Sequence, residues 1–414
     1  MKVLHLNTHT SGGSYEYAAL LSTALAEHGI ESRVLTKTSP SLDARKPFLD
    51  RVVRRAYISF STEPWHGTGR LLSPPSSVEL NGIDIVHLHT VADWFNVPKW
   101  LKRLPSSIGV VASLHDMWHV SGGCFLYRGC DLYAREADYC DPCPILRWPA
   151  NRLFARDEYS RKLHAYRNCG TRMVANSHWL AEVAGRSAIA KACGGVRVVL
   201  PAVDTAFFNQ QDKVLCRKHL GLSTDAFVIV TGGGSLNDSN KNVPWLFEQL
   251  TRLPNLGTVI VLAFGDGTVP VPAGLNVRFT GGIRERPELA RLFAAADVFV
   301  SASLMETYGL ALVEAMACGT PVVAFRVGGI PEAVPDRKVG ILCDPLDGAA
   351  FVSAIQELRG SARIRAELGT AASKLVAIRN NKARFAAEFV QLYEDCLNSA
   401  RNPFTRAELA KVSL

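Results

Sequence analysis

"DVFVSASLMETYGLALVEAMACGTPVVAF", residues 297–325, is the stretch of this sequence that indicates the fold most directly. Its first residues, DVFVSAS, have the apolar character of a buried strand, and residues 304–308 form the loop that leaves the carboxyl end of that strand. GLALVEAMACG follows as a helix that Gly319 ends, and PVVAF begins the next strand. A strand, a helix and a second strand at this spacing predict a parallel sheet covered by helices.

The same alternation runs through the chain twice. In the first half, apolar strands separated by longer amphipathic stretches are expected at residues 2–7, 82–90, 108–116, 172–179 and 196–204. A new series begins at residues 227–235, so the second half has its own start. A chain of 414 residues is too long for one compact core, which favours two domains. We therefore predict an α/β fold of two doubly wound, Rossmann-like domains that face a cleft.

The expected domain boundary lies near residues 203–206. Residues 1–203 form the predicted N-terminal, acceptor-side domain, with a cysteine-bearing insert near 120–145. Residues 204–381 form the predicted C-terminal domain. The last segment, 382–414, is expected to be helical and to pack back toward the N-terminal domain. Sheets of this kind bind ligands beyond the carboxyl ends of their strands.

The composition is that of an ordinary globular protein, with 48% hydrophobic and 20% charged residues. The net charge of +8 suits an acidic partner such as a nucleotide or a phospholipid surface, and it suits a merely soluble surface equally well. Basic runs such as RVVRR at 51–55 lack interleaved aromatic side chains, so nucleic acid is not an expected partner. The first residues turn polar by Asn7 and no apolar run is long enough to span a bilayer, which predicts a cytoplasmic protein.

Two carboxylates, Glu306 and Glu314, lie eight positions apart in the opening stretch. Glu306 falls in the loop before the helix and Glu314 about two turns into it. The backbone N–H groups of the first helical turn, residues 307–310, are suited to an anion such as a nucleotide diphosphate. The two carboxylates could accept hydrogen bonds from sugar and ribose hydroxyls on either side of it. The spacing alone is equally compatible with an acid at a helix N-terminus and a solvated acid.

The surrounding sequence adds a resemblance. Residues 279–334, FTGGIRERPELARLFAAADVFVSASLMETYGLALVEAMACGTPVVAFRVGGIPEAV, closely resemble the donor-binding half of the family 4 glycosyltransferases, which are retaining enzymes with the two-domain GT-B fold. The resemblance implies that Glu314 binds the donor ribose and that Glu306 meets a donor-sugar hydroxyl. It also implies that the backbone of Thr307, Tyr308, Gly309 and Leu310 contacts the sugar and the phosphates.

GGGSLNDSNKN, residues 232–242, resembles the phosphate loop of the same family. The resemblance makes Lys241 the phosphate-binding lysine and places Gly234 and Ser235 in the donor site. The family usually carries an arginine here as well, and this chain has Ser235 at one plausible place and Asn240 at another. The lost charge is expected to weaken diphosphate binding unless a nearby arginine replaces it.

Two arginines, Arg284 and Arg286, are the candidates for that replacement. The resemblance also assigns donor-binding roles to Ile283 and Arg284, where contacts to the base are largely made by backbone.

In the N-terminal half, LHDMW at 114–118 matches the family's histidine near the donor sugar. His115 would hydrogen-bond a sugar hydroxyl, and a polar loop histidine is the alternative. Gly12 and Gly13 match the glycine loop under the reacting centre and let a substrate approach the backbone closely. His87 and His89 lie on a predicted strand, where we expect their side chains to point in alternating directions, so that one of them is buried packing.

Four cysteines, Cys124, Cys130, Cys140 and Cys143, have the spacing C-x5-C-x9-C-x2-C. Four thiolates within 20 residues could form a closed, structural zinc site. Disulfides and free thiols remain open alternatives. A subgroup of the family 4 glycosyltransferases resembles this chain here, with a cysteine-bearing insert at the same place.

The chain contains no Asp-x-Asp motif, which holds a divalent metal on a nucleotide sugar in another glycosyltransferase architecture. The resemblance implies a metal-independent, retaining transfer from a UDP- or GDP-sugar to a saccharide or a lipid-linked saccharide, in polysaccharide biosynthesis. Residues 93–105 could touch the inner face of the cell membrane or pack on the N-terminal sheet. A nucleotide-sugar epimerase and a non-catalytic binding partner with a decayed donor site are the alternative functions.

Overall fold

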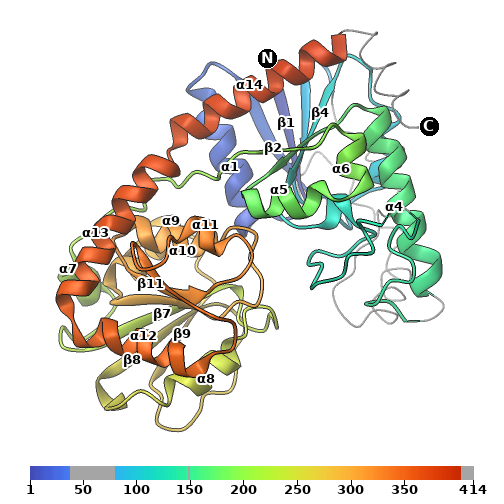
Figure 1. Ribbon diagram of the computed structural model, residues 1–414. Helices are drawn as coiled ribbons and strands as arrows, with labels where there is room; N and C mark the ends of the chain where they lie inside the picture. The colour runs from blue at the N-terminus through green and yellow to red at the C-terminus, as the bar shows by residue number, and fades with distance from the viewer. Residues whose placement is uncertain (38–79, 136, 148–149, 402–414) are drawn as a thin grey trace. The chain divides into compact units, whose positions relative to one another are not determined.

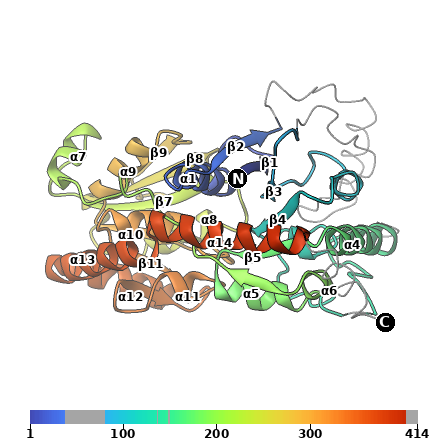
Figure 2. The ribbon, with the colours of Figure 1, turned by 90° about the horizontal axis from the view of Figure 1, so that it is seen from above.

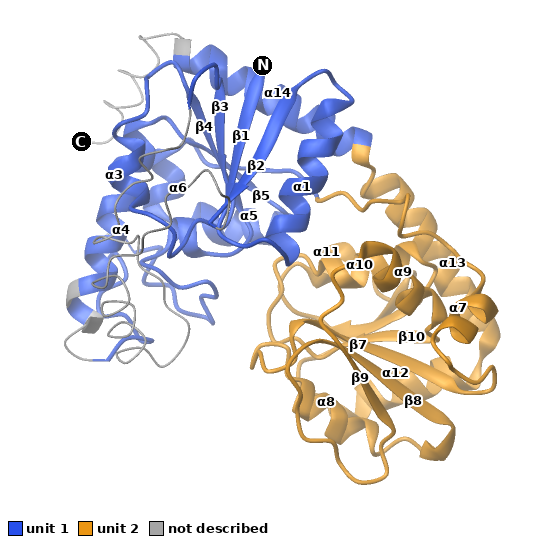
Figure 3. Ribbon diagram, turned by 180° about the vertical axis from the view of Figure 1, so that it is seen from behind, with its two compact units in different colours: residues 1–200, 383–414 blue, residues 201–382 orange. Residues whose placement is uncertain are grey.

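The computed structural model describes residues 1–37, 80–135, 137–147 and 150–401 (Figure 1). The basic run at 51–55 lies outside the described residues. The chain divides into two compact units, shown in Figure 3: unit 1 comprises Met1–Leu200 and Ala383–Leu414, and unit 2 comprises Pro201–Lys382. Each unit contains one parallel sheet with helices alongside it (Figure 2), which confirms the predicted α/β fold with two doubly wound sheets.

The sheet of unit 1 has the strand order β2-β1-β3-β4-β5-β6, and every neighbouring pair is parallel. Its strands are β1 (Lys2–Asn7), β2 (Glu31–Thr36), β3 (Ile85–Leu88), β4 (Gly109–Leu114), β5 (Arg172–Ala175) and β6 (Val196–Val198). The helical segments of this unit are α1 (Gly13–Ala26), α3 (Val97–Leu101), η1 (Trp118–Val120), α4 (Ala150–Asn168), α5 (His178–Gly185), α6 (Ala188–Ala192) and α14 (Lys382–Arg401). The strand order reverses between β1 and β3, and such a reversal is where open α/β sheets bind ligands.

The sheet of unit 2 has the order β12-β11-β10-β7-β8-β9 and is also parallel. Its strands are β7 (Phe227–Ser235), β8 (Val259–Asp266), β9 (Val277–Gly281), β10 (Val298–Ser301), β11 (Val322–Phe325) and β12 (Gly340–Cys343). Its helical segments are α7 (Lys213–His219), α8 (Val243–Leu250), η2 (Leu256–Thr258), α9 (Arg286–Ala295), α10 (Leu310–Ala317), α11 (Ile330–Ala333), α12 (Gly348–Gly360) and α13 (Ala362–Arg379). Here the reversal lies between β7 and β10.

The central strands are apolar because both of their faces are covered. Every residue of β4, GVVASL, and of β11, VVAF, is buried. Continuous apolar runs of this kind are typical of parallel strands that lie between two layers of helices. In the stretch that opened the sequence analysis, Gly309 precedes α10 with φ 91° and Gly319 follows it with φ 77°. Both positions use the left-handed region that glycine enters readily.

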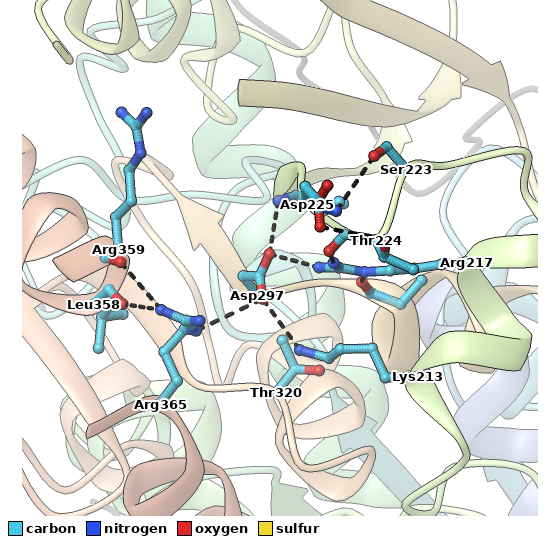
Figure 4. A network of polar contacts seen from close by, with 12 residues as sticks. Lys213, Arg217, Ser223, Thr224, Asp225, Asp297, Thr320, Leu358, Arg359 and Arg365 are labelled. Carbon is cyan, nitrogen blue, oxygen red and sulfur yellow. Dashed lines mark hydrogen bonds and ion pairs between the residues drawn. The ribbon is translucent and has the colours of Figure 1, made fainter. Parts of the chain in front are cut away.

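One buried carboxylate joins several elements of unit 2 (Figure 4). Asp297, which is 5% exposed, precedes β10 and accepts hydrogen bonds from the Val228 backbone N–H at 2.8 Å and from Arg217 Nη2 at 2.6 Å. Lys213 Nζ lies 3.3 Å away and Arg365 Nε lies 3.6 Å away. The carboxylate thus ties β7, α7 and α13 to the start of β10, and its burial is compensated by these cations.

The helix α14 belongs to unit 1 from Ala383 onward. Arg384 Nη2 donates to the Leu200 carbonyl at 2.9 Å, and the ring of Phe385 packs edge-on against Tyr17 of α1 at 4.9 Å between centroids. Tyr393 lies farther along the helix, with its hydroxyl 2.7 Å from Nδ1 of His87 on β3. These contacts attach the last described helix to the sheet of unit 1.

Several apolar side chains of residues 93–105 pack in the hydrophobic core of unit 1. They contain α3, whose first turn is capped by the Asn96 side chain. Phe95 and Trp100 are buried at 1% and 4% exposure. The structure therefore favours packing on the N-terminal sheet over membrane contact for these aromatic residues. Within the described part of the chain, no helix combines the length and the apolar character needed to cross a bilayer.

Candidate active site

The first cluster of predicted site residues forms at the carboxyl ends of β7 and β10. Lys241 Nζ lies 2.6 Å from Glu306 Oε1, although the two residues are 65 positions apart in the chain. The pair is partly exposed, with 25% of the lysine side chain and 19% of the glutamate side chain accessible. Burial alone would lower the pKa of Lys241, but the carboxylate of Glu306 outweighs it and the pKa is raised. Lys241 is therefore a permanent cation next to an acceptor.

Asn240 joins the two loops that carry this pair. Its side-chain N–H donates to the Met305 carbonyl at 2.8 Å, and its own carbonyl accepts from the Leu304 N–H at 2.8 Å. Ser235 is used locally: its hydroxyl donates to the Asp266 carbonyl and accepts from the Asn237 N–H. Both residues at the places expected for the family's arginine thus stabilise the loops, and neither supplies a charge.

The glycines of this loop allow close approach of the backbone. Gly232 has φ 146°, and a Cβ there would lie 2.0 Å from the Phe264 carbonyl oxygen. A Cβ on Gly233 would lie 3.1 Å from the Lys241 side chain, whereas Gly234 has open space around it. The loop therefore needs Gly232 for its own packing and leaves Gly234 accessible to a ligand.

Glu314 lies on α10 and is 7% exposed. It forms an ion pair with Arg286, the first residue of α9, and the Arg286 guanidinium lies 4.5 Å above the ring of Phe208. Arg284 and Ile283 lie in the loop between β9 and α9, where Arg284 is exposed and Ile283 is half-buried. Arg286 therefore pairs with the predicted ribose-binding carboxylate. The sequence did not indicate this pairing, because 28 residues separate the partners.

The loop between β10 and α10 is held by contacts of its own. Tyr308 is 1% exposed and its hydroxyl accepts from Asn380 Nδ2 at 2.9 Å, so its side chain is a packing element. The Glu306 carbonyl accepts from the Gly329 N–H at 2.9 Å, and a Cβ on Gly328 would lie 2.0 Å from that oxygen. The glycine pair after β11 thus holds the backbone of Glu306. Thr307, Gly309 and Leu310 complete the turn into α10.

The second cluster lies in unit 1, beyond the carboxyl ends of β3 and β4. A pocket there is lined by His89, Thr90, Val91, His115, Asp116, Trp118 and His119. His115 follows β4, as its sequence predicted, and its Nε2 lies 3.0 Å from His89 Nδ1. Gly12, with φ 91°, precedes α1, and Gly13 begins that helix; both are exposed.

The expectation that only one of His87 and His89 is buried is wrong. Both are fully buried, and their rings stack at 4.2 Å between centroids. Residues two apart on a strand point to the same face of the sheet, so the two side chains share one environment. His5, the register partner of His87 on β1, joins them.

His5, His87 and His89 are, among the described residues, the one set of three potential metal ligands whose donor atoms all lie within 4.8 Å of one another. All of their ring nitrogens except His5 Nε2 already have hydrogen-bond partners. His87 lies 2.7 Å from the Tyr393 hydroxyl and 2.8 Å from the Ser113 hydroxyl, and both nitrogens of His89 lie near other imidazoles. Because a metal ion would have to take these lone pairs, the arrangement favours a hydrogen-bonded cluster.

A buried lysine contacts the turn at residues 116–120, which borders the pocket. Lys162 of α4 donates to the Trp118 carbonyl, and its ammonium lies 4.3 Å from the centre of the Trp118 ring. Burial lowers the pKa of Lys162 to about 8. His119 Nε2 donates to the His89 carbonyl at 2.7 Å, and its Nδ1 lies 2.7 Å from the Tyr166 hydroxyl. These contacts fix residues 116–120 against α4 and β3.

The four clustered cysteines are free thiols. Cys140 and Cys143 are buried, and the Gly122 N–H donates to Cys140 Sγ at 3.2 Å. Burial raises the pKa of the Cys124 thiol to about 11. No three of the four sulfurs come within 4.8 Å of one another in the described residues. The structure therefore shows neither disulfides nor a formed four-sulfur site, and zinc stays a prediction.

Known proteins match both units. Residues 11–207 match the sequence model of Glycosyltransferase Family 4, and residues 227–360 match that of Glycosyl transferases group 1. D-inositol 3-phosphate glycosyltransferase 2 of Catenulispora acidiphila is 27% identical over 409 residues, which cover 89% of each chain.

Two solved structures share the fold. Sucrose-phosphate synthase of Thermosynechococcus elongatus gives a TM-score of 0.65 at 19% identity, covering 96% of this chain and 100% of that one. HepE of Anabaena, in complex with UDP and glucose, gives a TM-score of 0.60 at 18% identity, covering 95% and 99%. The molecule is thus a two-domain α/β protein with the GT-B fold. The family models that match the two units both describe glycosyltransferases, so the comparisons support glycosyltransferase activity, and Glycosyltransferase Family 4 itself is matched over residues 11–207.

Proposed function

We propose that the protein is a retaining glycosyltransferase that moves a sugar from a UDP- or GDP-sugar to a saccharide or lipid-linked saccharide, without a required metal ion. The observation that carries this proposal is the pair of ion pairs at the switch point of unit 2, Lys241–Glu306 and Arg286–Glu314. Ligands of open α/β sheets bind at such a point. A complex of the fold neighbour HepE with UDP-glucose and the matches to glycosyltransferase family models support the same substrate class.

Each residue of this cluster has a separate role in the proposal. Lys241 binds the diphosphate and stabilises the negative charge that develops on it as the bond to the sugar breaks. Glu306 accepts a hydrogen bond from a donor-sugar hydroxyl, and Glu314 accepts from the ribose. The backbone around Thr307, Gly309 and Leu310 adds uncharged donors at the start of α10.

In the transfer, the bond between the sugar C1 and the diphosphate oxygen breaks and a bond from an acceptor hydroxyl to C1 forms on the same face. The departing phosphate takes the acceptor's proton. His115 hydrogen-bonds a donor-sugar hydroxyl in this account, and Gly12 and Gly13 keep the approach to the sugar open. Residues 1–203 would serve the acceptor and residues 204–381 the donor, with 382–414 returning to the N-terminal domain.

The acceptor and the cellular setting are the less specific part of the proposal. The similar Catenulispora protein is named a D-inositol 3-phosphate glycosyltransferase, and the net charge of +8 suits an anionic or lipid-linked saccharide. A role in polysaccharide biosynthesis, in the cytoplasm at the inner face of the membrane, follows from the family resemblance alone.

Structural zinc at the four cysteines is a separate proposal. The hydrogen bond from the Gly122 N–H to Cys140 Sγ supports a zinc site, because hydrogen bonds of this kind orient the ligands of metal ions. Metal analysis of the purified chain tests it: one zinc per chain is expected, and metal-free protein of unchanged stability contradicts it.

A second candidate function is a non-catalytic nucleotide-sugar binding partner. It is favoured by Ser235 and Asn240, which stabilise loops where the family places an arginine. Nucleotide-sugar epimerase is a further alternative, which would convert the sugar without transferring it.

The deciding experiment measures nucleotide release from UDP-, GDP- and ADP-sugars. Release from one donor by the wild type, lost in Glu314→Ala and kept in the exposed control Glu367→Gln, is the expected result. Binding of a donor without release in any acceptor mixture would favour the binding partner, and an epimerised sugar with no free nucleotide would favour the epimerase.

A further inference from the structure

A row of buried imidazoles leads from the pocket of unit 1 into the middle of its sheet. His115 Nε2 lies 3.0 Å from His89 Nδ1, and His89 Nε2 lies 3.1 Å from His5 Nδ1. His5 and His89 are fully buried, whereas His115 is half-buried at the pocket. The three side chains come from β1, β3 and the end of β4, which are neighbours in the sheet.

These imidazoles are neutral at ordinary pH. Burial lowers the pKa of His5 and of His115 to about 3, and it lowers the pKa of His89 well below its ordinary value. A neutral imidazole carries one N–H and one lone pair. The row can therefore be hydrogen-bonded throughout in only two ways, in which all N–H groups point either toward the pocket or away from it.

The inner end of the row distinguishes these two directions. His5 Nε2 is buried and has no hydrogen-bond partner among the described residues. If the N–H groups pointed inward, His5 would carry its proton on Nε2 and bury an N–H donor with no acceptor, which proteins rarely do. If they point outward, Nε2 keeps a lone pair, and His5 Nδ1–H donates to His89 Nε2.

The proton position on His5 then fixes the proton positions on His89 and His115. Because His89 accepts at Nε2, its proton is on Nδ1, and it donates to His115 Nε2. Because His115 accepts at Nε2, its own proton is on Nδ1. We propose that His5 and His89 are positioning residues that hold His115 as its Nδ1–H tautomer.

The role of this arrangement in catalysis rests on the proposed function, in which His115 meets a donor-sugar hydroxyl. The assignment of the tautomer does not depend on that function. The surroundings are consistent with a fixed ring. Tyr17 of α1 packs edge-on against His115 at 4.8 Å between centroids, and His89 stacks on His115 at 5.3 Å. A ring held on two sides keeps the direction of its N–H.

The first test is nitrogen NMR of the imidazoles in the full chain, with His115 assigned by the signal that disappears in His115→Gln. The two nitrogens of a neutral ring differ in shift according to which carries the proton. The account expects His115, His89 and His5 all to be protonated on Nδ1. Protonation of His115 on Nε2 would overturn it, whatever the enzymatic activity.

The second test uses two substitutions of the same shape. Asn at position 89 can still donate from near the place of Nδ1, whereas Leu cannot. His89→Asn is expected to keep His115 as the Nδ1–H tautomer, and His89→Leu to release it. In the same pair, kcat for donor turnover should fall roughly fivefold to tenfold more in the Leu variant, with a smaller change in donor KM.

His87→Leu is the control. His87 is equally buried but bonds to Tyr393 and Ser113. The His87→Leu substitution should lower the stability of the folded protein and leave the His115 tautomer unchanged. A purely structural role for His89 predicts that Leu is tolerated at least as well as Asn, and that result would overturn the proposal. If neither variant folds, the wild-type spectrum still decides.

Discussion

The two polar clusters of this protein lie on the same kind of sheet, but their buried polar groups are stabilised in different ways. In unit 2, Lys241–Glu306 and Arg286–Glu314 are full charges that neutralise each other in pairs. In unit 1, the fully buried His5 and His89 and the half-buried His115 are neutral rings that form hydrogen bonds to one another. Paired charges suit a site that must meet a diphosphate, because a ligand can exchange with one partner. Neutral rings suit a site that must hold a fixed direction of donors.

The largest expected effect concerns the buried charges that support unit 2. Asp297→Ala should lower the free energy of unfolding by about 3–5 kcal/mol, because it leaves Arg217 buried without its carboxylate. Urea unfolding measures this loss. Asp225→Ala, at a nearby exposed carboxylate, is the control and should change little. A loss under about 1 kcal/mol would show that buried charges are not essential to this unit.

The next effect tests the charge at the site itself. Lys241→Met keeps the length of the side chain and removes its charge, so donor turnover should fall about 100- to 1000-fold. The exposed Lys338→Met is the matched control. Similar turnover in both variants would contradict the role of Lys241 on the diphosphate.

Acid should act mainly on the imidazole cluster of unit 1. Burial lowers the folded-state pKa of His5 to about 3 and of His119 to about 4, below the ordinary value near 6.5 in the unfolded chain. The unfolded chain therefore gains protons first as the pH falls below about 6.5, and stability falls with it. The expected slope between pH 6 and pH 4 approaches ~1.4 kcal/mol per pH unit for each such histidine.

Unfolding curves at pH 7, 6 and 5 check this slope. His5→Leu, which removes one of these histidines, should make the dependence shallower by one proton. A stability that is flat over this range would mean that these imidazoles take up protons at the same pH in the folded and the unfolded states.

Much of this comparison could be predicted from sequence, and the rest depended on contacts between distant segments. The alternation of strands and helices and the glycines around α10 follow from local rules, so the fold could be predicted. The pairing of Arg286 with Glu314, the Asp297 network and the role of Asn240 join segments that only the sheet order brings together. The error at His87 and His89 has a local cause, since residues two apart on a strand share a face.

The smallest effect concerns the missing arginine. Ser235→Arg would place a second cation beside Lys241 at the cost of two weak turn contacts. We expect donor affinity or turnover to rise by less than about tenfold, as for one added charge-assisted hydrogen bond. Ser235→Ala is the control for the lost turn contacts. A gain of many orders of magnitude would instead indicate that the natural site is decayed.

The central claim is that unit 2 binds a nucleotide through Glu314 and its neighbours. Calorimetric titration of UDP and GDP into the wild type, Glu314→Gln and the exposed control Glu367→Gln tests it most directly. The account predicts that one nucleotide binds to the wild type and the control, and that binding to Glu314→Gln is at least about tenfold weaker. Equal affinity in all three proteins, or no binding to the folded wild type, would contradict it.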